Sequence, residues 1–206
     1  RLCYTGSTFR YEQVQVRRQR EFTQAGVELI GSDDLMADIE VLVLAVEALR
    51  QAGLEEFRIG IGEINITEGF LREMLSEQDV EEARELVMDK DFVALKSMLM
   101  HRTDRQRAEV FMTLVTKNGG PEILDHIGQY SHAGPYQAAV AGLRELARVL
   151  GEYGVLDHVF FDFSILRNFR YYTGIVFEGY AQGLGHPVCG GGRYDSLLGD
   201  FGMDVP

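Results

Sequence analysis

The residues best suited to chemistry lie in the last fifth of the chain. The segment Arg167–Glu178 places a guanidinium just before a tyrosine pair and an apolar run, and the segment 190–195 runs from three glycines into Arg-Tyr-Asp. A guanidinium can hold a carboxylate or phosphate through two parallel hydrogen bonds. Glycines let a backbone approach a ligand closely or adopt a positive φ. These segments predict the floor of a small-molecule pocket, with a hairpin containing a glycine bulge as the plainer alternative.

A second group of candidate binding residues lies near the start of the chain, in the strand-like segment 21–30. Alternate residues of a strand share a face, so Gln24 and Glu28 point the same way beside Gly26, and the apolar residues between them point the other way. A carboxylate and an amide oxygen accept hydrogen bonds from an ammonium group. If a helix covers the apolar face, these two side chains line an open groove. A solvent-facing polar row is the alternative.

Strand-like and helix-like periodicities surround these residues and must position them. A helix should begin after Ser32 or Asp33 as N-cap, carry apolar residues at helical spacing, and end at Gly53. Along the final strand, Tyr172 and Glu178 should share one face. The expected strands are 2–9, 21–30, 57–62, 159–165 and 171–180.

The middle of the chain, 66–152, lacks strand signals and reads as an inserted helical subdomain between two parts of one sheet. The remaining residues, 1–65 and 153–206, then form the sheet-containing core, which makes the fold class α+β. The expected helices of the insertion are 67–76, 79–88, 91–100, 104–117, 121–129 and 135–152.

The composition is that of an ordinary globular protein, with 206 residues, 46% apolar residues and a net charge of −12. Such an acidic surface repels a phosphate backbone and disfavours nucleic acid as a partner. No apolar run reaches the length of a membrane span, so no membrane association is expected.

Cysteine and histidine usage indicates a cytoplasmic protein without a metal site. Cys3 and Cys189 are expected to be reduced thiols on neighbouring strands of one sheet, buried as small apolar residues. The five histidines have no metal-ligand spacing. No cofactor is expected. The chain begins mid-strand without an initiator methionine, so we expect it to be part of a longer protein.

Three separated motifs resemble one known family. Phe9–Glu12 together with Arg17–Gly31 resembles motif 2 of a class II aminoacyl-tRNA synthetase of the histidyl type. Arg167–Glu178 and Gly190–Asp195 resemble the two histidine-specific signatures of that family. The resemblance covers both β regions in the right order. It implies a class II synthetase-like antiparallel sheet flanked by helices, in a protein that dimerises.

The resemblance also assigns roles by position. In a synthetase, Arg10 and Arg167 would be the catalytic cations at the α-phosphate and the reacting carboxylate. Arg10, Glu12 and Arg18 would form the nucleotide site. Histidine would be bound by Gln24, Glu28, Arg167, Tyr171 and Tyr172, with Gln24 and Glu28 taking its ammonium.

Two departures favour a non-catalytic branch of this family. The motif 2 loop, 12–18, lacks the proline and glycine of the synthetase pattern, and Arg170 stands where an aspartate is usual. The amino-acid sequences of 22–31 and of the helical insertion instead resemble those of the regulatory subunit of short-form ATP phosphoribosyltransferase, which acts in the first step of histidine biosynthesis.

That branch implies a function without catalysis. The expected protein binds the catalytic phosphoribosyltransferase subunit and L-histidine, transmits histidine feedback, and is a homodimer within a hetero-oligomer. The alternative is a histidine–tRNA ligase.

Overall fold

The computed structural model describes residues 1–9, 11, 20–167 and 171–203. The predictions for Arg10, Glu12, Arg18 and Arg170 therefore lie outside the described residues.

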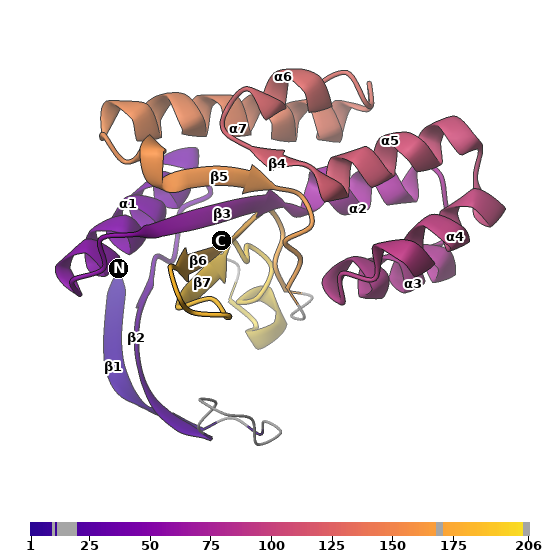
Figure 1. Ribbon diagram of the computed structural model, residues 1–206. Helices are drawn as coiled ribbons and strands as arrows, with labels where there is room; N and C mark the ends of the chain where they lie inside the picture. The colour runs from indigo at the N-terminus through magenta and orange to yellow at the C-terminus, as the bar shows by residue number, and fades with distance from the viewer. Residues whose placement is uncertain (10, 12–19, 168–170, 204–206) are drawn as a thin grey trace.

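The described strands form two sheets (Figure 1). The larger one has five strands in the order β4-β5-β3-β6-β7, and the smaller one is the ribbon β1-β2. All pairs are antiparallel except β3-β5, which is parallel. The expected antiparallel sheet is thus present with one parallel pair inside it. The strands are β1 Leu2–Phe9, β2 Glu21–Glu28, β3 Phe57–Glu63, β4 Asn118–Gly119, β5 Val159–Asp162, β6 Ile175–Ala181 and β7 Cys189–Gly192.

Strand β3 is the centre of the larger sheet and is buried on both faces except at Arg58. Its Ile59 and Ile61 are fully buried and share one hydrophobic cluster with residues of the helices. Alternating β-branched residues favour this position, because their stiff side chains pack well on a pleated surface. On the other face stand the glycines that alternate with these isoleucines. A Cβ on Gly62 would lie 2.6 Å from the carbonyl oxygen of Ile165, so that face lies against the chain that follows β5.

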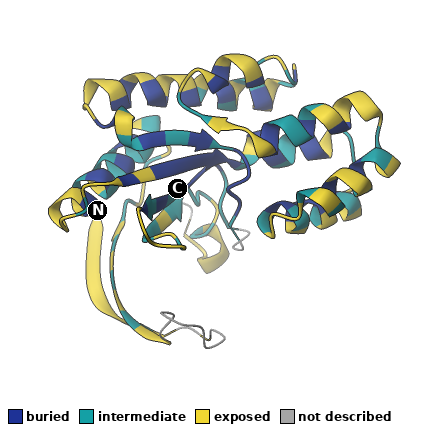
Figure 2. Ribbon diagram, viewed as in Figure 1, coloured by how far each residue is buried: buried dark blue, intermediate teal, exposed yellow. Residues whose placement is uncertain are grey.

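The ribbon β1-β2 extends away from the larger sheet (Figure 1), and its two expected strands pair antiparallel, with a register from Leu2↔Glu28 to Phe9↔Glu21. Seven of the eight β1 residues are exposed, whereas β2 alternates between exposed and half-buried (Figure 2). The two cysteines are unpaired, as expected, but the prediction that they are buried on one sheet was wrong. Cys3 is exposed on the ribbon and Cys189 is half-buried on β7, because the two strands belong to different sheets.

Helix α1, Leu35–Gln51, follows the ribbon. Its N-cap is Asp34, whose carboxylate accepts a hydrogen bond from the Met36 N–H at 2.7 Å, rather than the expected Ser32 or Asp33. The expected end is confirmed, since Gly53 has φ +84°, which a residue with a Cβ rarely adopts. Its buried face packs into the same cluster as β3.

The middle of the chain is helical, as expected, with one short strand that periodicity could not reveal. The two residues of β4 pair with β5 and so join this block to the sheet. The boundaries of the inserted subdomain stay a prediction, and its buried residues share one cluster with the sheet. The α-helices are α2 Ile64–Arg72, α3 Glu77–Met88, α4 Phe92–Arg102, α5 Arg105–Thr116, α6 Ile123–Ile127 and α7 Gly134–Glu152, with 3-10 turns η1 Leu156–His158 and η2 Gly199–Phe201.

Helix α7 is the longest helix of the block and runs beside α6 above the sheet in Figure 1. It begins with Pro135 in its first turn, where the missing N–H costs nothing. Tyr136 is fully buried, and its hydroxyl donates to the carbonyl of Ile127 at 3.0 Å. Across the described residues, no helix is both long and apolar enough to cross a membrane.

Candidate histidine-type pocket

The tyrosine-headed signature begins as a loop and becomes a strand only at Ile175. The alternation expected from residue 171 therefore starts four residues late. The loop is tied to the Arg-Tyr-Asp segment. The Thr173 N–H donates to the Arg193 carbonyl at 2.8 Å, and the Thr173 hydroxyl donates to Asp195 at 2.8 Å. The two signatures that the sequence separates by a dozen residues are thus one structural unit.

Arg167 lies at one end of this unit with unused hydrogen-bonding capacity. Its Nη1 is 3.5 Å from a carboxylate oxygen of Glu178, and its guanidinium carbon is 5.9 Å from the centre of the Tyr172 ring. Its Nε is buried and has no hydrogen-bond partner among the described residues. A buried donor without a partner costs free energy.

The three glycines are explained by the side chains that cross them. A Cβ on Gly190 would lie 2.2 Å from Nη1 of Arg167, and a Cβ on Gly192 would lie 2.7 Å from the ring of Tyr172. Gly191 is likewise crossed by the ring of Phe177, at 2.9 Å. The expected close approach is therefore made by the protein's own side chains. The alternative of a positive φ was wrong, because none of the three has one.

The tyrosines connect Arg167 to the ribbon. The rings of Tyr171 and Tyr172 are 4.7 Å apart, and Tyr171 meets Tyr194 edge-on at 6.2 Å. The hydroxyl of Tyr194 donates to the carboxylate of Glu28 on β2. The order Arg167–Tyr172–Tyr171–Tyr194–Glu28 will be called the tyrosine series. It brings together four of the five residues expected to bind histidine.

Partial burial shapes the acid–base behaviour of this series. Burial raises the pKa of Tyr172 to about 12, helped by its hydrogen bond with Tyr171 and opposed by Arg167. Burial, followed by the hydrogen bond to Glu28, raises the pKa of Tyr194 above its ordinary value. Both hydroxyls therefore stay protonated near neutral pH and act as hydrogen-bond donors. Arg167 and Glu28 both act electrostatically on Tyr172, and a guanidinium, a carboxylate and aromatic rings are group types that bind a zwitterionic amino acid.

The fifth expected residue, Gln24, lies elsewhere on the ribbon. Its amide donates to the hydroxyl of Tyr4 at 2.6 Å, and the Tyr4 ring lies across Gly26, where a Cβ would be 2.4 Å away. No contact described for Gln24 reaches the tyrosine series. Its assignment to the histidine ammonium stays a prediction.

Sequence reasoning missed two members of the site. Tyr194 was part of the Arg-Tyr-Asp segment but was not assigned a role, and it is the residue that joins Glu28 to the rings. Glu178 was placed on the Tyr172 face without a role. It lies beside Arg167 and accepts a hydrogen bond from the Tyr180 hydroxyl at 2.5 Å. The available signal was that Glu178 shares one face of the expected strand with Tyr172.

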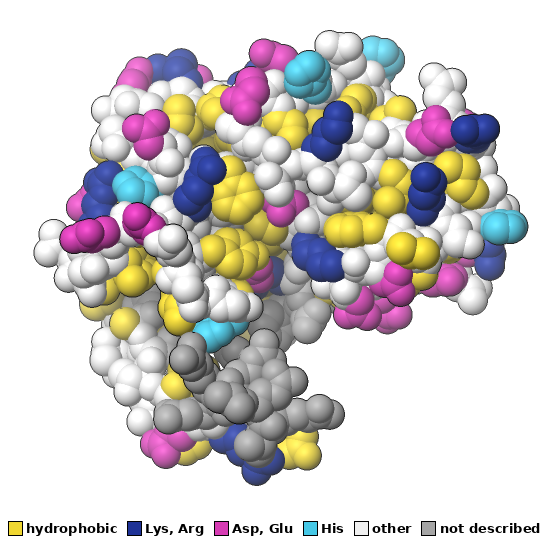
Figure 3. Space-filling view, in the orientation of Figure 1, with side chains coloured by type: hydrophobic (Ala, Val, Ile, Leu, Met, Phe, Trp, Pro, Cys, Tyr) yellow, Lys and Arg dark blue, Asp and Glu magenta, His cyan; other side chains and the backbone are white. Residues whose placement is uncertain are grey.

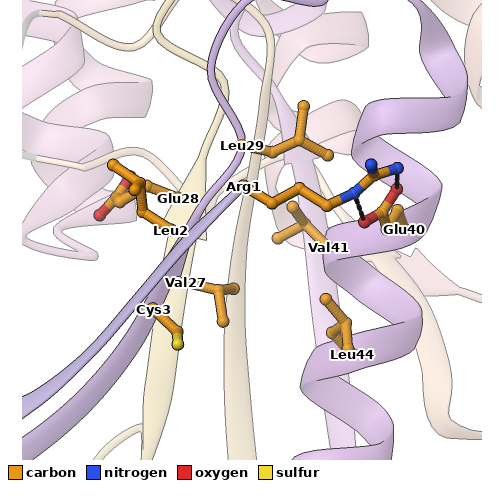
Figure 4. Close-up of a pocket in the computed structure, with 9 residues that line it drawn as sticks. All are labelled: Arg1, Leu2, Cys3, Val27, Glu28, Leu29, Glu40, Val41 and Leu44. Atoms are coloured by element: carbon orange, nitrogen blue, oxygen red, sulfur yellow. Dashed lines mark hydrogen bonds and ion pairs between the residues drawn. The ribbon is translucent and has the colours of Figure 1, made fainter.

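The apolar face of the ribbon was expected to be covered by a helix, and α1 lies opposite it without closing on it. Val27 remains 43% exposed, and an open groove of about 190 Å³ separates the ribbon from α1 (Figure 4). Arg1 crosses this groove to make two hydrogen bonds with Glu40, at 2.5 and 2.7 Å. The groove is lined by Arg1, Leu2, Cys3, Val27, Glu28, Leu29, Glu40, Val41 and Leu44.

The cation of the Arg-Tyr-Asp segment is structural. Arg193 is paired with Asp38 of α1 at 3.1 Å and with Asp195 at 2.9 Å. Glu63 lies close by at the β3-α2 junction, 6% exposed, and burial raises its pKa to about 7 although it accepts two hydrogen bonds from Asn65. Burial also raises the pKa of Asp38, against the effect of Arg193. The Arg193–Asp38 pair thus connects the Arg-Tyr-Asp segment to α1.

Within the part of the chain that the structure describes, no group of three or more His, Cys, Asp and Glu side chains is placed to hold a metal ion. On the face seen in Figure 3, acidic and basic side chains are interspersed.

The chain matches a known family over its whole length. The family model described as histidyl-tRNA synthetase matches residues 1–206. The chain is 46% identical to an ATP phosphoribosyltransferase regulatory subunit of Moorella thermoacetica and 43% identical to that of Desulforamulus reducens. All of this chain is matched in both comparisons, against 54% and 52% of the two relatives, so it spans about half their length.

Solved structures give the same fold. An ATP phosphoribosyltransferase regulatory subunit/histidyl-tRNA synthetase from Bacillus halodurans superposes with a TM-score of 0.92 at 33% identity, over 98% of this chain and 53% of that one. The histidyl-tRNA synthetase of Nostoc superposes with a TM-score of 0.81 at 22% identity, over 98% and 49%, which supports the fold alone. The expected class II synthetase-like α+β fold is therefore confirmed. The two curated relatives are named regulatory subunits of ATP phosphoribosyltransferase. The two signatures are joined by hydrogen bonds, and the family model matches the full length, so the chain belongs to the histidyl-tRNA synthetase family.

Proposed function

We propose that the protein containing this chain is a regulatory subunit of short-form ATP phosphoribosyltransferase that binds L-histidine in the tyrosine series. The names of the two curated relatives support the regulatory role. The observation that supports L-histidine as the ligand is the tyrosine series, which includes Glu28 and Arg167, whose Nε has no partner among the described residues. The ammonium of histidine meets Glu28, and its carboxylate meets Arg167.

The chemistry of the site needs binding only. Tyrosine rings attract an ammonium through their π faces, and a carboxylate adds a charge-assisted hydrogen bond. Arg167 offers donors to the histidine carboxylate without any bond being formed or broken. Feedback then requires that histidine bind the inhibited and active states of the assembled enzyme with different affinities.

Calorimetry of histidine binding to the whole protein tests the ligand. Glu28→Gln removes the charge while keeping the shape, so affinity should fall roughly tenfold to a hundredfold, as expected for a lost hydrogen bond to a charged group. Glu21→Gln, on the exposed end of the same strand, is the matched control and should change nothing. An unaltered affinity in Glu28→Gln would place histidine elsewhere.

Two assays separate the regulatory role from the alternative of a histidine–tRNA ligase. Mixed with a short-form catalytic phosphoribosyltransferase subunit, the whole protein should stimulate ATP-dependent turnover, and histidine should reverse the stimulation. It should not support histidine-dependent exchange of pyrophosphate into ATP. Robust exchange without stimulation would establish the ligase and remove the regulatory proposal.

The remaining predictions rest on the family. A homodimer within a hetero-oligomer with the catalytic subunit is the assembly we propose, and light scattering of the whole protein with and without that subunit tests it. A cytoplasmic location stays a prediction.

A further inference from the structure

The segment that carries Arg167 is held by the helical block as well as by the sheet. After β5 the chain runs down beside α2 and α3 before it reaches the tyrosine loop (Figure 1). Three of its backbone carbonyls, those of residues 163, 164 and 167, accept hydrogen bonds from side chains of that block. This stretch, 163–167, will be called the arginine segment.

The shortest of these bonds comes from Arg84 on α3. Its Nη2 donates to the carbonyl oxygen of Arg167 at 2.6 Å, and its Nε donates to Glu68 of α2 at 2.9 Å. Arg84 is only 6% exposed, and a buried cation needs such partners. The guanidinium of Arg84 therefore connects α2 and α3 to the main chain of Arg167.

A second tie comes from Lys90, just past the end of α3. Its Nζ donates to the Ser164 carbonyl at 2.7 Å and to the Ser164 hydroxyl at 2.6 Å, and that hydroxyl donates to Asp162 at 2.5 Å. Lys90 has φ +57°, the one positive φ found at a non-glycine among the described residues. Such a backbone conformation is unfavourable for a residue with a Cβ and persists where surrounding contacts hold it.

A third tie comes from Thr67 of α2, whose hydroxyl donates to the carbonyl of Phe163 at 2.8 Å. Thr67 is fully buried, so this bond is sheltered from water. Thr67 and Arg84 stand on two helices that pack on each other, and Lys90 follows directly after the second of them. A displacement of α2 and α3 must therefore move the arginine segment or break buried hydrogen bonds.

We infer that Arg84 and Lys90 are positioning residues that set the place of Arg167 in the pocket, so that the α2-α3 pair and the histidine carboxylate are energetically coupled. This inference rests on the proposed function. Neither residue touches the ligand. Each acts on it through the main chain of the arginine segment, and any force on α2-α3 reaches the pocket by the same route.

The test compares histidine with histidinol, in which an alcohol replaces the carboxylate, on the whole protein by calorimetry. Arg84→Met should weaken histidine binding roughly tenfold while changing histidinol binding by less than about twofold, because only the carboxylate depends on Arg167. Arg72→Met is the matched control. Arg72 pairs with the same Glu68 at 3.2 Å from an exposed position, so it should alter neither affinity.

A second variant covers the case in which Arg84→Met does not fold. Lys90→Gly removes the amine and relieves the positive φ, so the variant should fold while losing preference for histidine over histidinol. Unchanged preference in folded Arg84→Met, or in Lys90→Gly where the former does not fold, overturns the inference.

Hydrogen exchange distinguishes this failure from a failure of the proposed function. Without ligand, the amides of 164–167 should exchange faster in Arg84→Met than in Arg72→Met if the positioning is real. If these amides exchange faster in Arg84→Met but the wild type does not bind histidine, the proposed function and the coupling to histidine are overturned. The link between Arg84 and the arginine segment is then still supported. Equal exchange rates would remove the tie itself.

Discussion

The five-stranded sheet and the β1-β2 ribbon have opposite surroundings. Ile59 and Ile61 of β3 are fully buried, whereas Leu2 and Phe9 at the two ends of β1 are 63% and 73% exposed (Figure 2). The sheet is covered by helices, while the ribbon is linked to the rest of the described chain through contacts such as Arg1–Glu40 and Tyr194–Glu28.

The pocket draws one wall from each region. The Arg167 wall belongs to the sheet and helical block, where main chain and side chains are pinned by buried hydrogen bonds. The Glu28 wall belongs to the ribbon, where seven of the eight β1 residues and half of the β2 residues are exposed. A ligand that contacts both walls joins a region held by buried hydrogen bonds to one that is largely exposed.

The largest expected difference between the two regions is in stability. Ile59→Ala should lower the free energy of unfolding by about 2–5 kcal/mol, because it deletes fully buried methyl groups and leaves a cavity. The same substitution at Ile30, which is 38% exposed just after β2, should cost less than about 1 kcal/mol. Urea unfolding of both variants measures this. Equal losses would mean that the ribbon is as tightly packed as the sheet.

The second prediction uses a buried carboxyl to probe the sheet side. Burial raises the pKa of Glu63 to about 7, above the roughly 4.3 of an unfolded glutamate. Between these values the folded state keeps a proton that the unfolded state has released, so stability falls as the pH rises through this window. Glu63→Gln cannot titrate, and it should gain about 1–3 kcal/mol relative to wild type between pH 4.5 and 7.5.

Unfolding by urea at a series of pH values measures that gain. If wild type and Glu63→Gln give parallel profiles, Glu63 is hydrated and the sheet side is wetter at this point than its burial indicates. The variant keeps the carbonyl oxygen that accepts from Asn65, so the comparison changes charge with little change in packing.

The smallest effect concerns glycines on one strand of each region. Gly190→Ala on β7 should push aside the guanidinium of Arg167, which lies 2.2 Å from the new Cβ position, at a cost of about 1 kcal/mol and with weaker histidine binding. Gly6→Ala on β1 meets nothing within 4 Å and should leave stability and binding unchanged. Thermal unfolding and calorimetry measure both. If Gly190→Ala binds histidine normally, the observed place of Arg167 is not required for binding.

Much of the molecule was predictable because its signals are local. The cap and end of α1 were placed to within a residue or two, since capping and a left-handed glycine depend on neighbours in sequence. Four of the five expected histidine-site residues lie in the tyrosine series, because the motifs that predicted them are in contact in the fold.

The errors came from contacts between distant segments. Cys3 and Cys189 were expected on one sheet and lie on two, because strand pairing between remote segments leaves no local trace. The glycine triplet was given a role for a ligand, whereas Gly190 and Gly192 accommodate the side chains of Arg167 and Tyr172. Nothing in a single sequence reports which side chain will cross which backbone.

By itself, the sequence determined the alternation of strands and helices and the chemical types gathered in two signatures, since these follow from local periodicity and side-chain chemistry. Only the tertiary structure decided that Glu28 meets Tyr194 and that Arg84 holds the main chain of Arg167. These pairs are 166 and 83 residues apart in sequence. Packing of the whole chain brings the partners together, and a donor that packing buries needs a hydrogen-bond acceptor.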